Sequence, residues 1–564
     1  MMRLESLPNE IFYKIFDNLD VGERFNGFYN LNSRLNELLF SEYESYRINF
    51  CSILKCEMDF LIEEYVPSIV DRVISLRLSD DYDEGPSQTH LFFSSTLRLN
   101  EFIYLESLSL CFIERASIFR KIMDNSLENR HLKYVQVIKC NSKCMVSMDF
   151  SNNLWSFPQL SHCRLVMEEN FCVPTVISLS LKYLSISCNE WWIRQTSRLI
   201  EQSPSLEHLH IPLNNLNDDL HVTLPTFPSI TKLKLSNVRS SKVMENLVSS
   251  LPYLTYLKVD TYYLNTDGHT WAQIIDNHLP QLKIFHLRMN IQFRGRNNKE
   301  QVDQLFHSFK SEFWIEKHRW YIDCHPHYHE DNASVFVYTI PYAFNRINSN
   351  ILTENYLSTS DEEKNDSLLE NLTKIVIIDV DIPLKNLFLK SVRMFCYLKW
   401  LIVSPHDENS SIDLQRLIDR SPCLSSLTIK QNPSIEISLI EEINGSVTRL
   451  DIRSYNWYIS IELCHRFIVS SLAKQCEELL INVEHRQSII DLVNHLDHLR
   501  VLNAQYPVVP LSCHRHFVSD SSRNERSKDL SMKWFQDRLP QTSIICNFKS
   551  DYNSVAIHIY LRKR

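Results

Sequence analysis

The stretch Leu206-Glu207-His208-Leu209-His210-Ile211 places aliphatic residues at the first, fourth and sixth positions of a short segment. The same spacing returns at Ile230/Leu233/Leu235 and at Leu254/Leu257/Val259, with the middle leucines 24 residues apart each time. Apolar and polar residues alternate between positions four and six, as they do in a strand with one buried face. The spacing therefore predicts a strand that recurs at a fixed interval along the chain.

The recurrence extends over most of the sequence and has the period of leucine-rich repeats, about 20–29 residues. Helical spacing is visible between the strands, and Pro204, Pro252, Pro280 and Pro422 each follow such a segment. Because proline cannot continue a helix, these residues are stop signals independent of the leucines. The further copies are Leu105/Leu108/Leu110, Leu181/Leu184/Ile186, Leu282/Phe285/Leu287, Leu372/Ile375/Ile377, Leu398/Leu401/Val403, Leu424/Leu427/Ile429 and Val447/Leu450/Ile452, with weaker ones at Cys476/Leu479/Ile481 and Leu499/Leu502/Ala504. We therefore expect an α/β fold, a curved leucine-rich-repeat solenoid.

The period fails between Leu287 and Leu372, which divides the array into two blocks. The failing stretch has an aromatic-rich segment, an alternating segment and a polar, acidic segment at 353–368, so it predicts an inserted β-hairpin and a polar loop. The expected organisation is an N-terminal helical module (1–45), a helical linker (46–72), the first block (73–290), the insertion (291–370), the second block (371–510) and a C-terminal cap with a hairpin (511–564).

Composition excludes several function classes. The chain has only 6 glycines in 564 residues, none in a phosphate-cradling spacing, which argues against a nucleotide cofactor. A net charge of −9 argues against a general nucleic-acid coat. The 15 cysteines include no CxxC pair, so we expect reduced thiols. Without a signal peptide or a long apolar run, no membrane association is expected, and the chain is predicted to be cytoplasmic or nuclear.

The N-terminus has the pattern of a small helical module. Leu7, Ile11, Ile15 and Leu19 recur every four residues, and Phe12 and Phe16 widen this apolar face. Pro8 suits a first helical turn. Two further short helices are expected around Phe25–Leu31 and Leu35–Leu39. Three helices in so few residues make a marginal core, so the module is expected to need a partner. The alternative is a plain cap that seals the repeats.

This order of residues resembles an F-box, the module that docks a protein onto a ubiquitin-ligase scaffold. Asn32-Ser33-Arg34-Leu35 departs from the family, which often has Trp at the position of Leu35. The resemblance implies a Skp-type adaptor and a cullin as partners. It implies adaptor contacts at Leu7, Pro8, Glu10, Ile11, Ile15, Phe16 and Leu19.

No residue pattern predicts catalysis, and we expect neither a cofactor nor a metal. The densest group of potential ligands is Cys324-His325-Pro326-His327-Tyr328-His329-Glu330. On a strand its three histidines would share one face, but Pro326 interrupts a regular ladder and no matching Cys or His pair follows. The preferred interpretation is a polar turn at the tip of the inserted hairpin. A metal-dependent enzyme remains the alternative.

The residues between the inward leucines of the first block form what we call the basic strip. Stacked strands lie about 4.8 Å apart, so these side chains should form one continuous surface. An ordinary solvated strand face is the alternative. The members of the basic strip are His208, His210, Lys232, Lys234, Tyr256, Lys258, His286 and Arg288. The second block offers Trp400, Lys430, Arg449 and Arg453 at equivalent positions.

These observations together predict a non-catalytic, two-ended protein. The F-box would bind the Skp-type adaptor, and the basic strip would bind an unidentified target protein through an acidic or phosphorylated segment. No nucleic acid or membrane partner is expected. The alternative is a leucine-rich-repeat scaffold or inhibitor that binds a protein without any ligase.

Overall fold

The computed structural model divides the chain into two compact units, Met1–Met289 and Asn290–Arg564. The residues that it describes are 7–17, 19, 21–40, 46–50, 61–80, 89, 92, 98–126, 129–215, 224–262, 264, 266–295, 297–329, 332–344, 346–348, 357–359, 374–376, 395–403, 410–430, 446–453, 458–507, 533–540, 543–550 and 554–561. Within these residues the strands form two sheets, in the orders β1-β2-β3-β4-β5-β6-β7-β8-β9-β10-β12-β11-β14 and β13-β15-β16-β17-β18-β19-β20-β22-β21.

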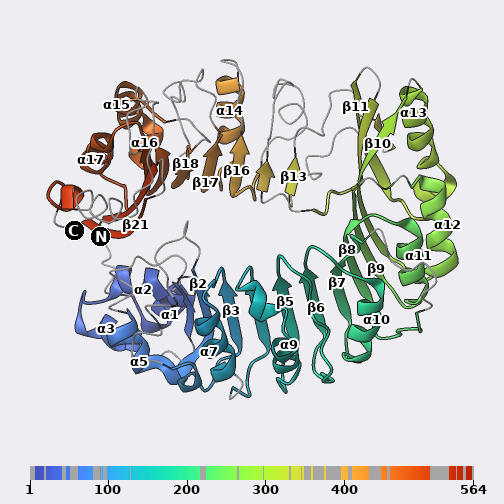
Figure 1. Cartoon of the computed structure of the whole chain (residues 1–564), viewed down its shortest axis with the longest axis horizontal. Coiled ribbons are helices and arrows are strands. Elements are labelled where there is room, and N and C mark those ends of the chain that lie inside the picture. The colour runs from blue at the N-terminus through green and yellow to red at the C-terminus, as the bar shows by residue number, and fades with distance from the viewer. Residues whose placement is uncertain are drawn as a thin grey trace, which may run out of the picture. The chain divides into compact units, whose positions relative to one another are not determined.

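The first unit alternates strands with helices along the chain (Figure 1). Its strands are β1 (Tyr46–Asn49), β2 (Val73–Ser79), β3 (Ser107–Cys111), β4 (Tyr134–Ile138), β5 (His162–Val166), β6 (Tyr183–Ser187), β7 (His208–Pro212), β8 (Lys232–Val238), β9 (Tyr256–Tyr262) and β10 (Ile284–Arg294), the last of which crosses the unit boundary. Its helical segments are α1 (Asn9–Asp17), α2 (Val21–Phe28), α3 (Ser33–Phe40), η3 (Leu61–Tyr65), α5 (Val66–Ile69), η4 (Val70–Arg72), η5 (Leu99–Glu101), α7 (Ala116–Ser126), α8 (Ser142–Met145), α9 (Met148–Trp155), α10 (Ile193–Glu201), α11 (Ser241–Ser249) and α12 (Gly268–His278).

Each repeat stacks on the next in the same register. Leu209 of β7 is the Cα partner of Leu233 in β8, and Leu233 is the partner of Leu257 in β9, all in parallel pairs. These side chains are buried, and burying one leucine contributes about 1.5–3 kcal/mol. Because the leucines point toward the helices, the alternating polar residues of the same strands point to the opposite face of the sheet. The sequence period therefore sets which side chains that face presents.

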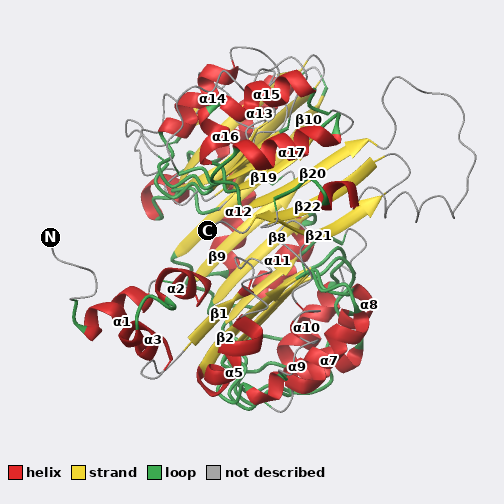
Figure 2. Cartoon of the chain, turned by 90° about the vertical axis from the view of Figure 1, so that its left-hand side faces the viewer, coloured by secondary structure: helices red, strands yellow, loops and turns green. Residues whose placement is uncertain are grey.

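The helices start and stop at residues that the chain marks. Ser240 accepts a hydrogen bond from the backbone N–H of Val243 at 3.4 Å, and Asp267 accepts one from Thr270 at 2.8 Å. Side-chain oxygens at these positions satisfy amides that have no partner inside the helix. The α11 helix ends at Ser249, three residues before Pro252. In Figure 2 the helices α7, α9 and α10 lie along one side of the strands of this unit.

One difference from the sequence prediction lies in the expected helical linker. The segment 46–72 does contain η3, α5 and η4, but it begins with strand β1. Strand β1 pairs in parallel with β2, with Ile48 opposite Leu76. Tyr46 and Ile48 are buried, so β1 adds a further strand to the parallel stack before the first leucine-patterned copy. The segment is too short and too weakly patterned to show this as a repeat.

The α1–α3 module has a small aromatic core of its own. Phe12, Phe16 and Phe28 pack edge to face or tilted, with ring centroids 5.1–6.2 Å apart. Leu35, Leu38 and Leu39 of α3 complete this cluster. Aromatic pairs at such distances stabilise a core beyond simple burial. The module therefore has an interior and an outer surface, which separates its structural residues from those that a partner could touch.

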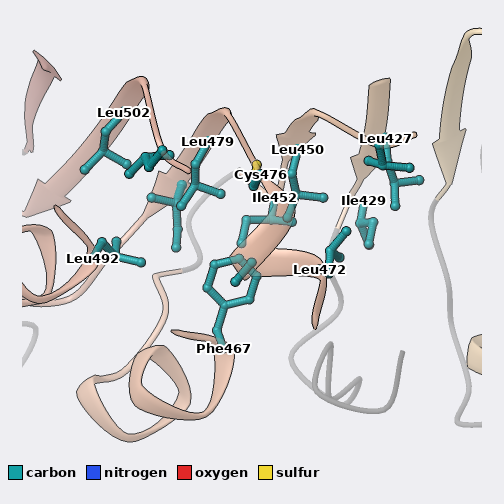
Figure 3. Packing of buried hydrophobic residues seen from close by; sticks show 14 of the residues in the cluster. Leu427, Ile429, Leu450, Ile452, Phe467, Leu472, Cys476, Leu479, Leu492 and Leu502 are labelled. Atoms are coloured by element: carbon teal, nitrogen blue, oxygen red, sulfur yellow. The ribbon is translucent and has the colours of Figure 1, made fainter. Parts of the chain in front are cut away.

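The second unit contains both strands and helices, with helices between strands mainly from β16 to β20. Its strands are β11 (Tyr321–His329), β12 (Asn332–Ile340), β13 (Arg346–Asn348), β14 (Leu357–Ser358), β15 (Lys374–Val376), β16 (Trp400–Val403), β17 (Ser426–Ile429), β18 (Arg449–Asp451), β19 (Glu478–Asn482), β20 (Val501–Pro507), β21 (Ser543–Ser550) and β22 (Ser554–Leu561). Its helical segments are α13 (Asn298–Ser308), η6 (Phe313–Lys317), α14 (Ser410–Asp419), α15 (Ile461–Val469), α16 (Ser471–Gln475) and α17 (Arg486–His495). Figure 3 shows Leu427, Leu450, Leu479 and Leu502 of successive strands packed with Phe467 of α15 in one core.

Two hairpins interrupt or end the parallel stack. Strands β11 and β12 pair antiparallel along their whole length, from Tyr321↔Ile340 to His329↔Asn332, in the region where the sequence predicts an insertion. Strands β21 and β22 form a second antiparallel pair, and β22 also pairs antiparallel with β20. The polar loop predicted at 353–368 lies outside the described residues, apart from β14 and Thr359.

Candidate functional site

The basic strip lies in register across the strands. His208 of β7 is the Cα partner of Lys232 in β8, and His210 is the partner of Lys234. Lys232 in turn faces Tyr256 of β9, and Lys234 faces Lys258. The predicted residues of these three strands therefore form two columns across the sheet, one through His208 and one through His210.

The pKa values of the three histidines of the strip are all lowered, so these imidazoles are neutral at physiological pH. Burial, followed by repulsion from Lys234, Lys258 and Arg164, lowers the pKa of His210 to about 4. Burial and repulsion from Lys258 likewise lower the pKa of His286 to about 4. Burial also lowers the pKa of His208. The positive charge of the strip therefore comes from its lysines and Arg288, and the imidazoles supply neutral hydrogen-bonding groups.

The surroundings of Lys258 disfavour the charged form of its side chain. Burial, then repulsion from Lys234 and Arg288, lowers its pKa to about 8, although Asp260 opposes this effect. Burial and then Lys232 also lower the pKa of Lys234. Among the residues that the structure describes, no carboxylate forms an ion pair with Lys232, Lys234 or Arg164. The fold thus holds several ammonium groups close together on a partly buried surface.

Arg288 of β10 forms an ion pair with a carboxylate on the neighbouring strand β9. Its Nε donates to Oδ1 of Asp260 at 2.7 Å, and its Nη2 donates to Oδ2 of the same residue. Such a bidentate pair compensates the guanidinium charge locally. The sequence predicts that Arg288 contacts the target, but in the structure its guanidinium is already paired with Asp260 on the neighbouring strand. This pair could have been expected from the sequence, because Asp260 follows Lys258 by two residues on β9 and therefore lies on the same face of the sheet.

The same face continues into the predicted strand β6 and into β4 and β5, which the sequence analysis did not predict. Tyr134, His162 and Tyr183 are successive Cα partners in β4, β5 and β6, and Tyr183 is the partner of His208. The rings of His162 and Tyr183 stack with centroids 5.6 Å apart. Arg164 lies in the neighbouring column, two residues along from His162. We call Tyr134, His162 and Tyr183 the aromatic column. The missed signal is Leu132/Val135/Val137 and Leu160/Cys163/Leu165, which keep the repeat spacing with Val or Cys replacing Leu.

In the second block, two of the predicted cations form ion pairs with carboxylates. Arg449 of β18 is the Cα partner of Glu478 in β19, and its Nε lies 3.2 Å from the Glu478 carboxylate. Arg453 pairs with Asp451 at 2.9 Å. Opposite charges directly across a sheet stabilise the strand pair. Trp400 stays exposed on this face. Arg449 is therefore compensated at the position where the first block places Lys232 between His208 and Tyr256.

The predicted adaptor contacts of the α1–α3 module separate into outer and inner residues. Ile11 is 38% exposed, and Pro8 and Glu10 are exposed as well. Leu7, Ile15 and Leu19 are partly buried against the aromatic core. Phe16 is an exception, because its ring lies inside that core against Phe12 and Phe28. Phe16 cannot offer its side chain to a partner in this conformation.

Arg34 fixes the start of α1, a role that the sequence did not show. Its Nη2 donates to the carbonyl of Leu7 at 2.7 Å, and its Nε donates to Oδ1 of Asn9 at 3.0 Å. The guanidinium also lies 5.6 Å from the centroid of the Phe12 ring. Arg34 therefore ties α3 to the first turn of α1, at the position just before the Leu35 that departs from the F-box pattern.

The histidine cluster of the insertion lies within strand β11, so the prediction of a turn at the hairpin tip is wrong. His325 is buried, and its Nε2 lies 3.2 Å from the hydroxyl of Tyr338, which donates to Asp323 at 3.3 Å. Burial raises the pKa of the Asp323 carboxyl to about 6. Pro326 is accommodated opposite Val335. Within the described part of the chain, no group of three or more His, Cys, Asp or Glu side chains could hold a metal ion.

No family model matches the sequence, and no curated protein matches it. Among the described helices, none is both long and apolar enough to cross a membrane. The chain is similar to a solved structure described as a complex of Rad7 and Elc1 in yeast, with 10% sequence identity, a TM-score of 0.31, and coverage of 80% of this chain and 98% of that chain.

Proposed function

We propose that this chain is a non-catalytic recognition subunit of a cullin-type ubiquitin ligase. The α1–α3 module would bind a Skp-type adaptor, and the first repeat block would bind a target protein. The observation that carries the proposal is a small helical module with an F-box-like sequence, followed directly by a stacked repeat array. Its action would be proximity, because holding a target near a charged enzyme raises the effective concentration of its lysines.

The exposed part of α1 supports a docking role. Ile11 and Pro8 are exposed apolar residues at the start of the helix, and Leu31 is 58% exposed in the loop before α3. The core beneath them is complete without these three side chains. An apolar surface that is not needed for the module's own packing suits contact with another protein.

Affinity purification from eukaryotic cells tests the docking. We expect the wild-type chain to co-purify with a Skp-type adaptor and a cullin. Ile11→Asp should reduce adaptor binding by about tenfold or more, since it places a charge in an apolar interface. Lys14→Ala is the matched control, because Lys14 is exposed on the same helix and outside the predicted contacts. If the wild-type chain captures neither adaptor nor cullin, the chain is a repeat scaffold without a ligase.

A further inference from the structure

Lys234 and Lys258 form an unusual pair for adjacent strands of a sheet. They are direct Cα partners in the parallel ladder of β8 and β9. Like charges directly opposite in a sheet are destabilising, and partial burial increases the cost of each charge. Lys232 adds a third ammonium group two residues from Lys234. A stable array has no structural need for this arrangement, because the pair at the equivalent positions of β18 and β19 in the second block is Asp451 with Leu480.

Neutral donors flank the lysine pair on both sides. His210 is the Cα partner of Lys234 on β7, and its Nδ1 lies 3.0 Å from the hydroxyl of Ser185. His286 on β10 lies beyond Lys258, and its ring is 5.6 Å from that of Tyr256. Its Nδ1 is buried and has no hydrogen-bond partner among the described residues. Two cations and two imidazoles therefore lie on four consecutive strands, at a strand spacing of about 4.8 Å.

The charge and the donor set match a phosphomonoester better than a carboxylate. A phosphorylated side chain carries about −1.5 to −2 charges and three acceptor oxygens at neutral pH. It can accept from both ammonium groups at once and balance both charges. A carboxylate carries a single negative charge and two acceptor oxygens, so it matches two adjacent ammonium groups less well than a phosphate does. The flexible stems of Lys234 and Lys258 allow both ammonium groups to approach one tetrahedral anion.

We propose that Lys234, Lys258, His210 and His286 form a binding site for a phosphorylated segment of a partner protein. The segment would lie on the open face of the sheet, with the phosphate on β8 and β9 and flanking residues against the aromatic column. Tyr134, His162 and Tyr183 supply apolar and aromatic contact area there, which suits a peptide. This inference deepens the proposed function, since it names the chemistry of the target that the repeats would recognise.

Binding of defined peptide pools to the purified chain tests the site. The probes are fluorescent degenerate decapeptides with a central phosphoserine, the matching pool with serine, and a single-stranded oligonucleotide. We expect the phosphoserine pool to bind about tenfold or more tightly than the serine pool, because charge-assisted hydrogen bonds to phosphate are strong. The double variant Lys234→Met/Lys258→Met should lose this preference. Lys242→Met, on the exposed surface of α11 in the same unit, should keep it.

Three results would overturn the site. They are equal binding of the phosphoserine and serine pools, equal loss of binding in the Lys242→Met control, and tighter binding of the oligonucleotide than of the phosphoserine pool. Circular dichroism of each variant shows that it is folded. The assay contains no adaptor, and Ile11→Asp should bind the phosphoserine pool as the wild type does. A failure of adaptor docking is therefore distinguishable from a failure of the phosphate site.

Discussion

Replacing Lys258 by Met should stabilise the first unit, although it should remove phosphopeptide binding. Met keeps an unbranched apolar stem of similar size and removes a charge that the surroundings disfavour. The pKa of Lys258 falls from 10.5 to about 8 because of burial and then the charges of Lys234 and Arg288. At about 1.4 kcal/mol per pKa unit, the unscreened cost of the charged form is about 3.4 kcal/mol. Lys258 is partly exposed, so solvent screening reduces the expected gain to about 1–2 kcal/mol.

The sign of the pH dependence is fixed by the direction of the pKa change. Below pH 8 the lysine is charged in both the folded and the unfolded states, so the wild type bears the full cost. Between pH 8 and 10.5 the unfolded chain binds more protons than the folded chain, and wild-type stability rises with pH. The advantage of Lys258→Met should therefore fall to less than about half at pH 9.5.

Hydrogen exchange of peptides covering β8 and β9 is the suitable assay, because a repeat array opens locally. Exchange in Lys258→Met should be about 5- to 30-fold slower than in the wild type at pH 7, with both proteins compared at the same pH. Lys242→Met should not change exchange in these strands. Equal or faster exchange in Lys258→Met would refute the claim that the charged form of Lys258 destabilises the folded state.

Three further predictions concern stability. Leu233→Ala, at a fully buried position, should destabilise the first unit by about 2–5 kcal/mol in urea denaturation, whereas Lys232→Ala should stay within about 0.5 kcal/mol. Arg34→Leu should speed exchange in α1, because it removes the hydrogen bonds to Leu7 and Asn9, a loss of about 1–3 kcal/mol. Between pH 6.5 and 4 the unfolded chain protonates His210 and His286 while the folded chain does not, so the free energy of unfolding should decrease as the pH is lowered. This decrease should be smaller in His210→Gln/His286→Gln.

Each of these has a clear contrary outcome. Similar effects of Leu233→Ala and Lys232→Ala would mean that the two faces of the sheet are not distinguished as described. Unchanged exchange in Arg34→Leu would mean that α1 is held by its aromatic core alone. An acid transition identical in the double histidine variant and the wild type would show that other groups control the acid response.

The strands were the most predictable part of the chain, because a strand with one buried face leaves a strict spacing. The same criterion failed where Cys163 and Val135 replaced leucine, although their side chains are as deeply buried. Substitution by another apolar residue preserves burial and hides the repeat. The same alternation identified the eight residues of the basic strip. It did not predict the protonation states of the histidines or the ion pair of Arg288.

The electrostatics could not be read from the sequence because they depend on neighbours about 25 residues away. His210 is neutral because the fold buries it and because β8 and β9 bring Lys234 and Lys258 beside it. Arg288 is compensated only because β9 presents Asp260. In α1 the sequence showed a wide apolar face, and only packing against Phe28 separates the buried Phe16 from the exposed Ile11.

The reversal of direction at β22 has a consequence for how this protein can change in length. From β1 to β9 each junction between neighbouring strands is parallel, so a duplicated repeat could be inserted there and meet the same kind of neighbour on both sides. Beyond β20 the next strand, β22, runs antiparallel and no longer presents a repeat-type edge. Gain or loss of repeats during evolution, or by design, is therefore expected inside the arrays. The antiparallel pair of β20 and β22 would be retained at the end of the second sheet.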